Sequence, residues 1–300
     1  MRGDLAGHAA MLCFSALVAG SFALGGLIAN LISPLALTAV RFALAALAIA
    51  ALALATTGLP LATFRAPWRF AVLGGVFAIY FVLMFEGLKT ATPVSTAAVF
   101  TLTPVMSAGF GYLLLGQLMT RRLALALAIG AAGALWVIFR GDVTALLRFD
   151  VGRGEAVFLA GCVAHALYTP LVRRLNRGES PVVFPVGTFV AGAAIVAMIG
   201  VRDIAAMDWV SLPALVWVVL AYLAVVTSAL TLILLQFATL RLPSAKVMAY
   251  TYMTPAFVIL WEVALGNDLP PLHVVPGVVL TAGALALTLK RAGRDVILWA

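Results

Sequence analysis

The sequence predicts an all-α integral membrane protein, with ten transmembrane helices arranged as two inverted five-helix repeats around a central cavity. Its composition, its apolar runs and an internal repeat predict this fold. Of its 300 residues, 64% are hydrophobic and 10% are charged, and its mean hydropathy of +1.15 exceeds what a soluble core of this length needs. The apolar runs are continuous, whereas strands of a membrane barrel would alternate.

Each helix that crosses the hydrocarbon needs about 20 apolar residues. The expected spans are residues 6–30, 34–56, 68–88, 92–115, 121–140, 154–173, 181–201, 211–237, 244–266 and 272–290. The first run is too long for a signal peptide and has no Ala-x-Ala site, so we assign it to the first helix. The longest connection, 141–153, is expected to be only a short loop, which leaves no room for a soluble domain.

Positively charged residues predict the orientation, because Lys and Arg near the ends of spans tend to stay in the cytoplasm. With the N-terminus inside, thirteen of them are cytoplasmic and five lie outside. The outside set is Lys89, Arg140, Arg148, Arg153 and Arg202. We therefore expect a multi-pass protein with both termini cytoplasmic. The net charge of +8 then reflects basic loops at the lipid bilayer and not a nucleic-acid partner.

Matching motifs about 150 residues apart indicate an internal repeat. They are Ser33-Pro34 and Ser180-Pro181, Thr103-Pro104 and Thr254-Pro255, and "AGAL" at 132–135 and 282–285. We therefore divide the chain into two five-helix units, 5–140 and 152–290. Because five is odd, the second unit enters the membrane from the opposite side, an architecture common in secondary transporters.

The two Thr-Pro pairs lie at equivalent places in this repeat. Proline removes a backbone hydrogen bond, and in hydrocarbon the freed carbonyl needs a neighbour or a water-filled cavity. Two related kinks near the middle of the membrane are therefore expected to frame a central cavity. The alternative is that proline is simply frequent in membrane helices.

Several longer motifs resemble the EamA-domain family of the drug/metabolite transporter superfamily. They are "GSF" at 20–22, "VRFALAAL" at 40–47, "GLKTATPVSTAAVFTLTPV" at 87–105, "GAAGALWVI" at 130–138, "AHALYTPLVRR" at 164–174 and "AGALAL" at 282–287. The resemblance covers nearly the whole chain.

This resemblance implies a secondary transporter, driven by a gradient of protons or another ion, that works by alternating access. Such carriers are often exporters of amino acids or other small metabolites. It further implies a small-molecule substrate and a place in the cell inner (plasma) membrane. Because the chain shows no catalytic constellation, we expect no cofactor and no enzyme activity. Spans one to four and six to nine would surround the cavity, with spans five and ten outside it.

Polar and aromatic residues on shared helical faces are candidates for substrate binding, since ligand cavities combine apolar walls with a few oriented polar groups. The same residue types also serve packing between membrane helices, and this interpretation stays open for each of them. With the buried cation of span two added, the predicted substrate-binding residues are Arg41, Tyr80, Phe100, Thr103, His165, Tyr168, Tyr250 and Thr254.

Ionisable residues inside spans are costly, about 2.5 to 3.5 kcal/mol each on insertion scales. Arg41 is expected either to pair with Glu86 or to bind an anionic group of the substrate, where a planar guanidinium holds two oxygens. Glu86 and Glu262 are expected near the outer ends of their spans, where they reach solvent, or, for Glu262, couple to protons. His165 is expected to be a packing residue or a proton relay.

Other classes of protein lack their signatures here. Three histidines, His8, His165 and His273, are scattered over different spans, and Cys13 and Cys162 lie in apolar runs, so we predict no metal site and no disulfide. The chain carries no phosphate loop for ATP. A channel, which would need a polar filter, and a membrane-embedded enzyme of unknown chemistry remain the alternatives.

Overall fold

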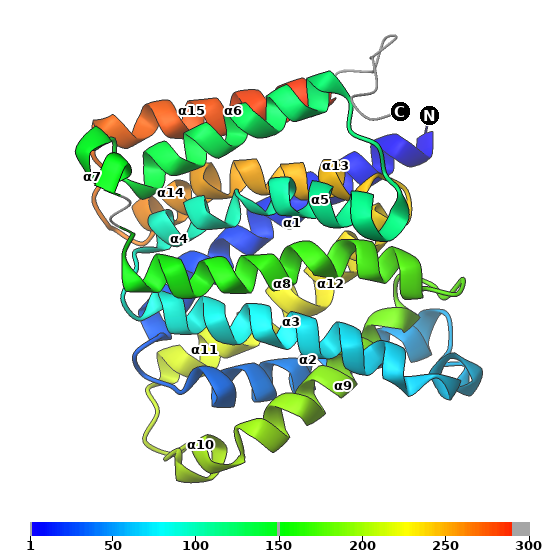
Figure 1. The fold of residues 1–300 in the computed structure, drawn as a ribbon. Helices are drawn as coiled ribbons and strands as arrows, with labels where there is room; N and C mark the ends of the chain where they lie inside the picture. The colour runs from blue at the N-terminus through cyan, green and yellow to red at the C-terminus, as the bar shows by residue number, and fades with distance from the viewer. Residues whose placement is uncertain (1, 149–150, 290–300) are drawn as a thin grey trace.

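A computed structural model describes residues 2–148 and 151–289, and this part of the chain contains helices and no β-strand (Figure 1). The elements of the first half are α1 (Arg2–Ile28), α2 (Pro34–Thr56), η1 (Leu61–Arg65), α3 (Pro67–Leu88), α4 (Pro93–Phe100), α5 (Thr103–Leu115), α6 (Arg121–Ile138) and α7 (Val143–Arg148).

The second half contains more short elements. They are α8 (Arg153–Leu175), α9 (Val183–Ile199), α10 (Val201–Ala206), α11 (Ala214–Ala224), η2 (Val225–Leu230), α12 (Thr231–Thr239), α13 (Ser244–Met248), η3 (Ala249–Met253), α14 (Thr254–Ala264), η4 (Leu272–Val274) and α15 (Val275–Leu289).

Eight helical segments in the described residues are long and apolar enough to cross a membrane. They correspond to the predicted spans one to six, eight and nine. At the predicted seventh and tenth spans the structure has two shorter apolar helices, Val183–Ile199 and Leu272–Thr288. The protein is therefore a multi-pass membrane protein, and the two shorter helices fall at the lower end of the length that spans hydrocarbon.

Proline and threonine determine where several helices begin. Pro34, Pro67 and Pro93 occupy the first turns of α2, α3 and α4, where a missing N–H costs nothing. The Thr92 side chain caps α4 by accepting from the Ser95 N–H, and Thr120 caps α6 in the same way. These residues therefore define where α2, α3, α4 and α6 begin.

The connection 141–153 is more structured than the short loop that we expected. It contains the one-and-a-half-turn helix α7, whose first N–H groups, from Thr144 and Ala145, donate to the Asp142 carboxylate. A carboxylate at this position satisfies groups that the helix leaves free. Asp142 is thus a helix cap.

The two halves pack on each other in a reciprocal way. Helix α3 packs against α8 and α9, while α11 and α12 of the second half pack against α1 and α2. Helix α2 also packs on α9, and α6 lies beside α15 along one edge of the molecule (Figure 1). The remaining helices enclose the centre of the bundle.

Glycines allow the closest contacts between the halves. A Cβ atom on Gly74 of α3 would lie 2.5 Å from the Gly192 nitrogen of α9, and one on Gly87 would lie 2.7 Å from the Gly154 carbonyl of α8. Small residues at such points let helix backbones touch, which is a main source of attraction between helices in lipid.

Candidate functional site

Two discontinuous helices flank the centre of the bundle. The first stops at Phe100 and starts again at Thr103, and Pro104 lies in the first turn of α5. Proline cannot donate to the Phe100 carbonyl four residues earlier, so the Thr103 hydroxyl donates to it instead. The Thr-Pro pair therefore breaks the helix and satisfies the carbonyl that the break exposes.

The second Thr-Pro pair forms a similar break. Helix α13 passes into the 3-10 segment η3, and α14 begins at Thr254 with Pro255 in its first turn. Here the Thr254 N–H donates to the Thr251 carbonyl, whereas its buried hydroxyl has no partner. Both breaks lie in the middle of apolar segments, as predicted for the kinks.

An aromatic stack fills the space beside the first break. The His165 ring of α8 lies 4.3 Å from Tyr80, 5.2 Å from Phe100 and 6.0 Å from Phe77, measured between ring centroids. Tyr168, one turn further along α8, stacks on Phe77 at 4.7 Å. The structure thus brings together four of the predicted site residues, and Phe77 joins them.

His165 is buried in this stack, and neither of its ring nitrogens has a hydrogen-bond partner among the residues that the structure describes. Buried polar atoms nearly always have partners, and exceptions in a native structure call for an explanation such as a functional role. The imidazole therefore has two atoms available to a molecule that enters the centre.

Arg41 lies beside the same stack and is fully buried. Its guanidinium packs over the Phe81 ring, 3.8 Å from the ring centroid, an attractive arrangement for a cation. Its Nε–H donates to the Ser228 hydroxyl, and Nη2 donates to the hydroxyl and the carbonyl of Thr227 at 3.0 and 3.1 Å. The other terminal nitrogen, Nη1, has no hydrogen-bond partner within residues 2–148 and 151–289.

The predicted ion pair between Arg41 and Glu86 is wrong. Glu86 instead pairs with Lys89, three residues along the chain, at 2.7 Å, and its side chain is 40% exposed. Glu86 therefore reaches solvent at the end of α3, as its position near the end of a span suggested. Arg41 takes neutral partners from the other half of the chain.

The partners of Arg41 come from a local irregularity that sequence reasoning missed. Residues Val225–Leu230 form a π-helical turn, in which the Ser228 hydroxyl donates to the Leu223 carbonyl five residues earlier. Such turns are rare and often occur at functional sites. The only signal in the sequence was the Thr227-Ser228 pair inside a long apolar run.

Gln236 is a second residue that the sequence reasoning missed. Its amide nitrogen donates to the Tyr168 hydroxyl at 3.0 Å, and its buried carbonyl oxygen has no partner. It is also a polar residue in an otherwise apolar run, so it could have been found by the criterion that selected His165.

The remaining predicted residues lie apart from the stack. The Tyr250 hydroxyl is 2.9 Å from the His8 Nδ1 atom of α1, and the Tyr250 carbonyl accepts from the Ser15 hydroxyl. Thr254 starts α14. All eight predicted residues are buried, and each is at most 3% exposed. The centre is therefore closed to solvent in this structure.

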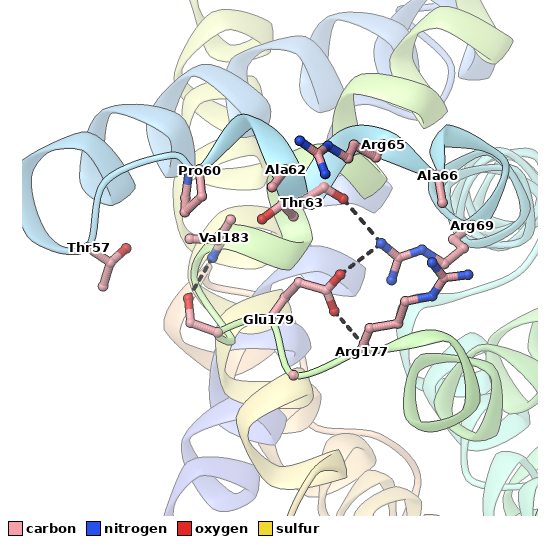
Figure 2. Close-up of a pocket in the computed structure, with 12 residues that line it drawn as sticks. Thr57, Pro60, Ala62, Thr63, Arg65, Ala66, Arg69, Arg177, Glu179 and Val183 are labelled. Atoms are coloured by element: carbon pink, nitrogen blue, oxygen red, sulfur yellow. Dashed lines mark hydrogen bonds and ion pairs between the residues drawn. The ribbon is translucent and has the colours of Figure 1, made fainter.

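Open cavities lie instead toward the two ends of the bundle. One, of about 520 Å³, is bounded by η1, the start of α3 and the loop between α8 and α9 (Figure 2). Another, of about 300 Å³, lies at the opposite end, where Arg140, Glu262, Asp268 and His273 line it. The Glu262 carboxylate there accepts from the Asn267 amide at 2.9 Å.

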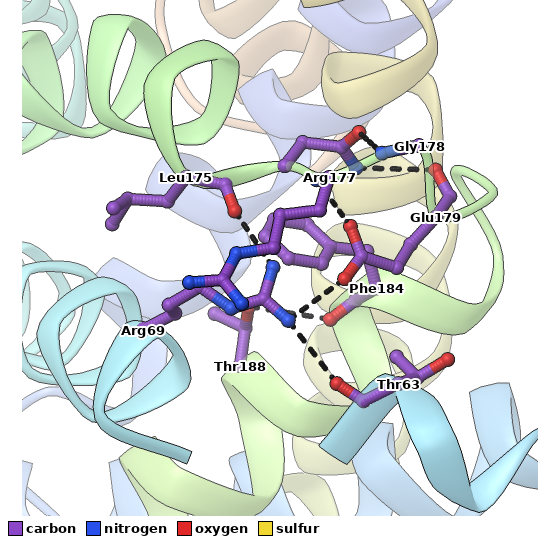
Figure 3. A network of polar contacts seen from close by, with 9 residues as sticks. Thr63, Arg69, Leu175, Arg177, Gly178, Glu179, Phe184 and Thr188 are labelled. Carbon is purple, nitrogen blue, oxygen red and sulfur yellow. Dashed lines mark hydrogen bonds and ion pairs between the residues drawn. The ribbon is translucent and has the colours of Figure 1, made fainter. Parts of the chain in front are cut away.

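An ion pair links the two halves at the end with the larger cavity. Arg69 of α3 is 2.8 Å from the Glu179 carboxylate and also donates to the Leu175 and Thr63 carbonyls (Figure 3). Although burial raises the pKa of Glu179, hydrogen bonds from Arg69 and from the Arg177 N–H outweigh this effect and lower its pKa below 4.5. Glu179 is therefore held as a carboxylate.

Comparisons with known proteins agree with this architecture. The sequence model of the EamA-like transporter family matches residues 5–139 and 152–290. The chain is 26% identical over 218 residues to the uncharacterized transporter YyaM of Bacillus subtilis (strain 168), a match that covers 72% of this chain and 71% of that protein. A solved crystal structure has a similar fold, with a TM-score of 0.73 over 96% of both chains at 21% identity.

Proposed function

Because the chain belongs to the EamA-like transporter family, we propose that this membrane transporter is a gradient-driven secondary carrier that works by alternating access. The observation that carries the proposal is a closed polar and aromatic centre beside two discontinuous helices. Secondary transporters typically bind their substrates near the middle of the membrane, at helices that are interrupted in corresponding positions of two repeats.

The proposal includes ten membrane-spanning helices in two inverted repeats, residues 5–140 and 152–290. In such a repeat α3 corresponds to α11 and α12, and α8 corresponds to α1. The contact of α3 with α8 therefore predicts a contact of α11 and α12 with α1, and both contacts occur. Helices α2 and α9 are equivalent in the two halves, and so are α6 and α15. Their contacts with each other would lie on the two-fold axis that relates the halves. This reciprocity supports a two-fold relation between the halves.

The proposed substrate carries a carboxylate and an apolar or aromatic part, as amino acids do. Arg41 binds the carboxylate through Nη1 in a charge-assisted hydrogen bond, since its other nitrogens are held by Thr227 and Ser228. The rings of Tyr80, Phe100 and Tyr168 contact the apolar part, and His165 donates or accepts a hydrogen bond.

Thr103, Tyr250 and Thr254 have a different role in this proposal. Thr103 and Thr254 start the second segments of the two discontinuous helices, so they move with the breaks when the carrier changes state. Tyr250 joins η3 to α1 through His8 and Ser15. The two breaks then transmit the movement of one end of the bundle to the other.

Orientation, direction and energy source complete the proposal. Both termini are cytoplasmic in the cell inner (plasma) membrane, by the excess of Arg and Lys at one end of the bundle. The carrier exports its substrate in exchange for protons or another ion. The proposed proton-accessible groups are Glu262 and His273, which line the cavity of about 300 Å³ at the outer end of the bundle.

Comparison of culture media tests this function. Metabolites outside cells that overexpress the protein are compared with those outside cells that lack it, and we expect one carboxylate-bearing compound to accumulate with overexpression. The purified protein in proteoliposomes should then move this compound in a saturable way, and dissipation of the ion gradient should abolish net accumulation. Non-saturable flux would indicate a channel, and chemical conversion of the compound would indicate an enzyme.

A further inference from the structure

The cavity at the Arg-rich end of the bundle has the features of an anion site. It has a volume of about 520 Å³ and is lined by residues of η1, of α3 and of the loop that precedes α9 (Figure 2). Three arginines, Arg65, Arg69 and Arg177, line it, against a single acid, Glu179. The cavity wall therefore has a formal charge of +2.

The three arginines that line this cavity differ in their contacts. Arg69 is buried and is held by Glu179 and two carbonyls, although its Nε has no hydrogen-bond partner in the described part of the chain. Arg65 and Arg177 are exposed, and among the described residues neither guanidinium forms an ion pair. Two cations therefore face the cavity without a counter-charge, and a third has a free buried donor.

Two helix N-termini add to the positive potential. Ala66, which precedes α3, and Ser180 and Val183 at the start of α9 line the same cavity. Free N–H groups and the helix dipole favour an anion at such ends. Thr57, the C-cap residue that follows α2, also lines the cavity, and this helix C-terminus has the opposite effect, but it does not offset two arginines.

The surroundings of the cavity place it near the lipid surface. Trp68, next to Arg69 on α3, is 55% exposed, and Leu61 of η1 is 84% exposed. Exposed tryptophan is typical of the boundary between hydrocarbon and headgroups, and basic pockets between helices at this depth suit phosphate-bearing headgroups.

We infer that this cavity binds a phosphate group, held by Arg65 and Arg177 and by the hydroxyls of Thr63 and Ser180. Guanidinium groups on two sides suit the several oxygens of phosphate, and the volume exceeds that of the bare ion, so room remains for an attached organic group. Two sources offer this chemistry: a soluble phosphate compound and an anionic phospholipid. The site is separate from the proposed substrate centre and does not depend on it.

Thermal unfolding of the full-length protein tests this site. In neutral detergent, inorganic phosphate is titrated at constant ionic strength, and in a second arm vesicles of phosphatidylcholine alone are compared with equal parts phosphatidylcholine and phosphatidylglycerol. A ligand that binds the folded state raises the unfolding temperature in a saturable way. We expect at least one arm to show this, and the arm that responds identifies the source.

Charge-matched variants decide whether the effect belongs to the cavity. The double variant Arg65→Gln with Arg177→Gln should raise the apparent Kd about tenfold or more, since charged hydrogen bonds are lost. The control Arg121→Gln with Arg174→Gln removes the same charge from exposed residues at the same end but outside the cavity, and it should bind like the wild type. No saturable stabilisation in either arm, or equal weakening in both double variants, would overturn the inference.

Discussion

Arg41 of α2 and Ser228 of η2 form a hydrogen bond across the two halves of the chain, in which the guanidinium Nε–H donates to the serine hydroxyl. Thr227 accepts from Nη2 of the same guanidinium. The two partners fix one side of the planar group and leave Nη1 free in the buried centre. A cation that would otherwise be costly in a membrane is thus held by neutral groups, in an orientation that suits an anionic ligand.

Replacement of Arg41 by Lys tests whether this orientation matters. Lysine keeps the charge, but its single nitrogen cannot bond to Thr227 and Ser228 and also present a separate free donor as the guanidinium does, so we expect transport of a carboxylate substrate to fall about tenfold or more, the loss of one charged hydrogen bond. The measurement is flux in proteoliposomes per amount of folded protein. Arg202→Lys, an exchange at an exposed residue of α10, should leave flux unchanged. Unchanged flux in Arg41→Lys would refute the anchor role.

Pro104→Ala and Pro255→Ala test the two helix breaks. Alanine restores the missing N–H donor and favours a continuous helix, so each variant should lose more transport than folded protein in the membrane. Flux and folded amount are measured on the same preparations. Pro170 lies inside α8, which continues through it, so Pro170→Ala serves as the control. Equal losses of flux and folded amount would return both breaks to a purely structural role.

The lowered pKa of Glu179 predicts a dependence of stability on pH. A carboxyl whose pKa is lower in the folded state stabilises the fold above its unfolded pKa, near 4.5, and this stabilisation is lost as pH falls through the folded pKa. Wild-type unfolding temperature should therefore drop between pH 5 and lower values more steeply than that of Glu179→Gln. Glu86→Gln removes a partly exposed pair at the end of α3 and should retain the wild-type slope. The same slope in all three proteins would contradict the prediction.

Gly74→Ala should destabilise the contact between α3 and α9. The added Cβ would lie 2.5 Å from both the Gly192 nitrogen and the Thr188 carbonyl oxygen, which are backbone atoms, and overpacking of this kind costs about 1 to 3 kcal/mol. Gly75→Ala is a matched control, because its Cβ would meet only the Ile195 side chain at 3.6 Å. Unfolding in detergent compares the two. A Gly74 variant as stable as the Gly75 variant would show that the backbones can separate freely.

Labelling of single cysteines tests the proposed orientation. In a background without Cys13 and Cys162, cysteines at Arg65, Arg121 and Arg177 should be protected from an impermeant thiol reagent in intact cells. One at Arg148 should react. Reaction at Arg121 with protection at Arg148 would reverse the orientation.

Composition and periodicity predicted most of the helical segments, because an apolar run of about 20 residues has few alternatives in lipid. The Thr-Pro pairs also predicted the two breaks, since proline acts through local backbone chemistry. The sequence also placed His165 and Tyr168 one turn apart in one span, and in the structure both rings stack on Phe77.

Contacts between the halves were not predictable in the same way. Arg41 and Ser228 are 187 residues apart, and their approach depends on how two helices are rotated about their axes. Glu86 is nearer in sequence and of opposite charge, yet it lies at the end of α3 and pairs with Lys89. The π-helical turn has no distinctive composition, so neither it nor its role in holding Arg41 could be read from the residues.

The π-helical turn η2 holds one residue more than an α-helical turn, and this extra residue changes the orientation of α12, which follows it in the same span. One residue turns an α-helix by about 100°, so if the same residues of Val225–Leu230 wound as a regular α-helix, α12 would be turned by more than a quarter turn from its present orientation. Gln236 would then face away from the Tyr168 hydroxyl to which it now donates. The π-helical turn thus acts as an angular offset, through which one span presents Thr227 and Ser228 to Arg41 and Gln236 to Tyr168.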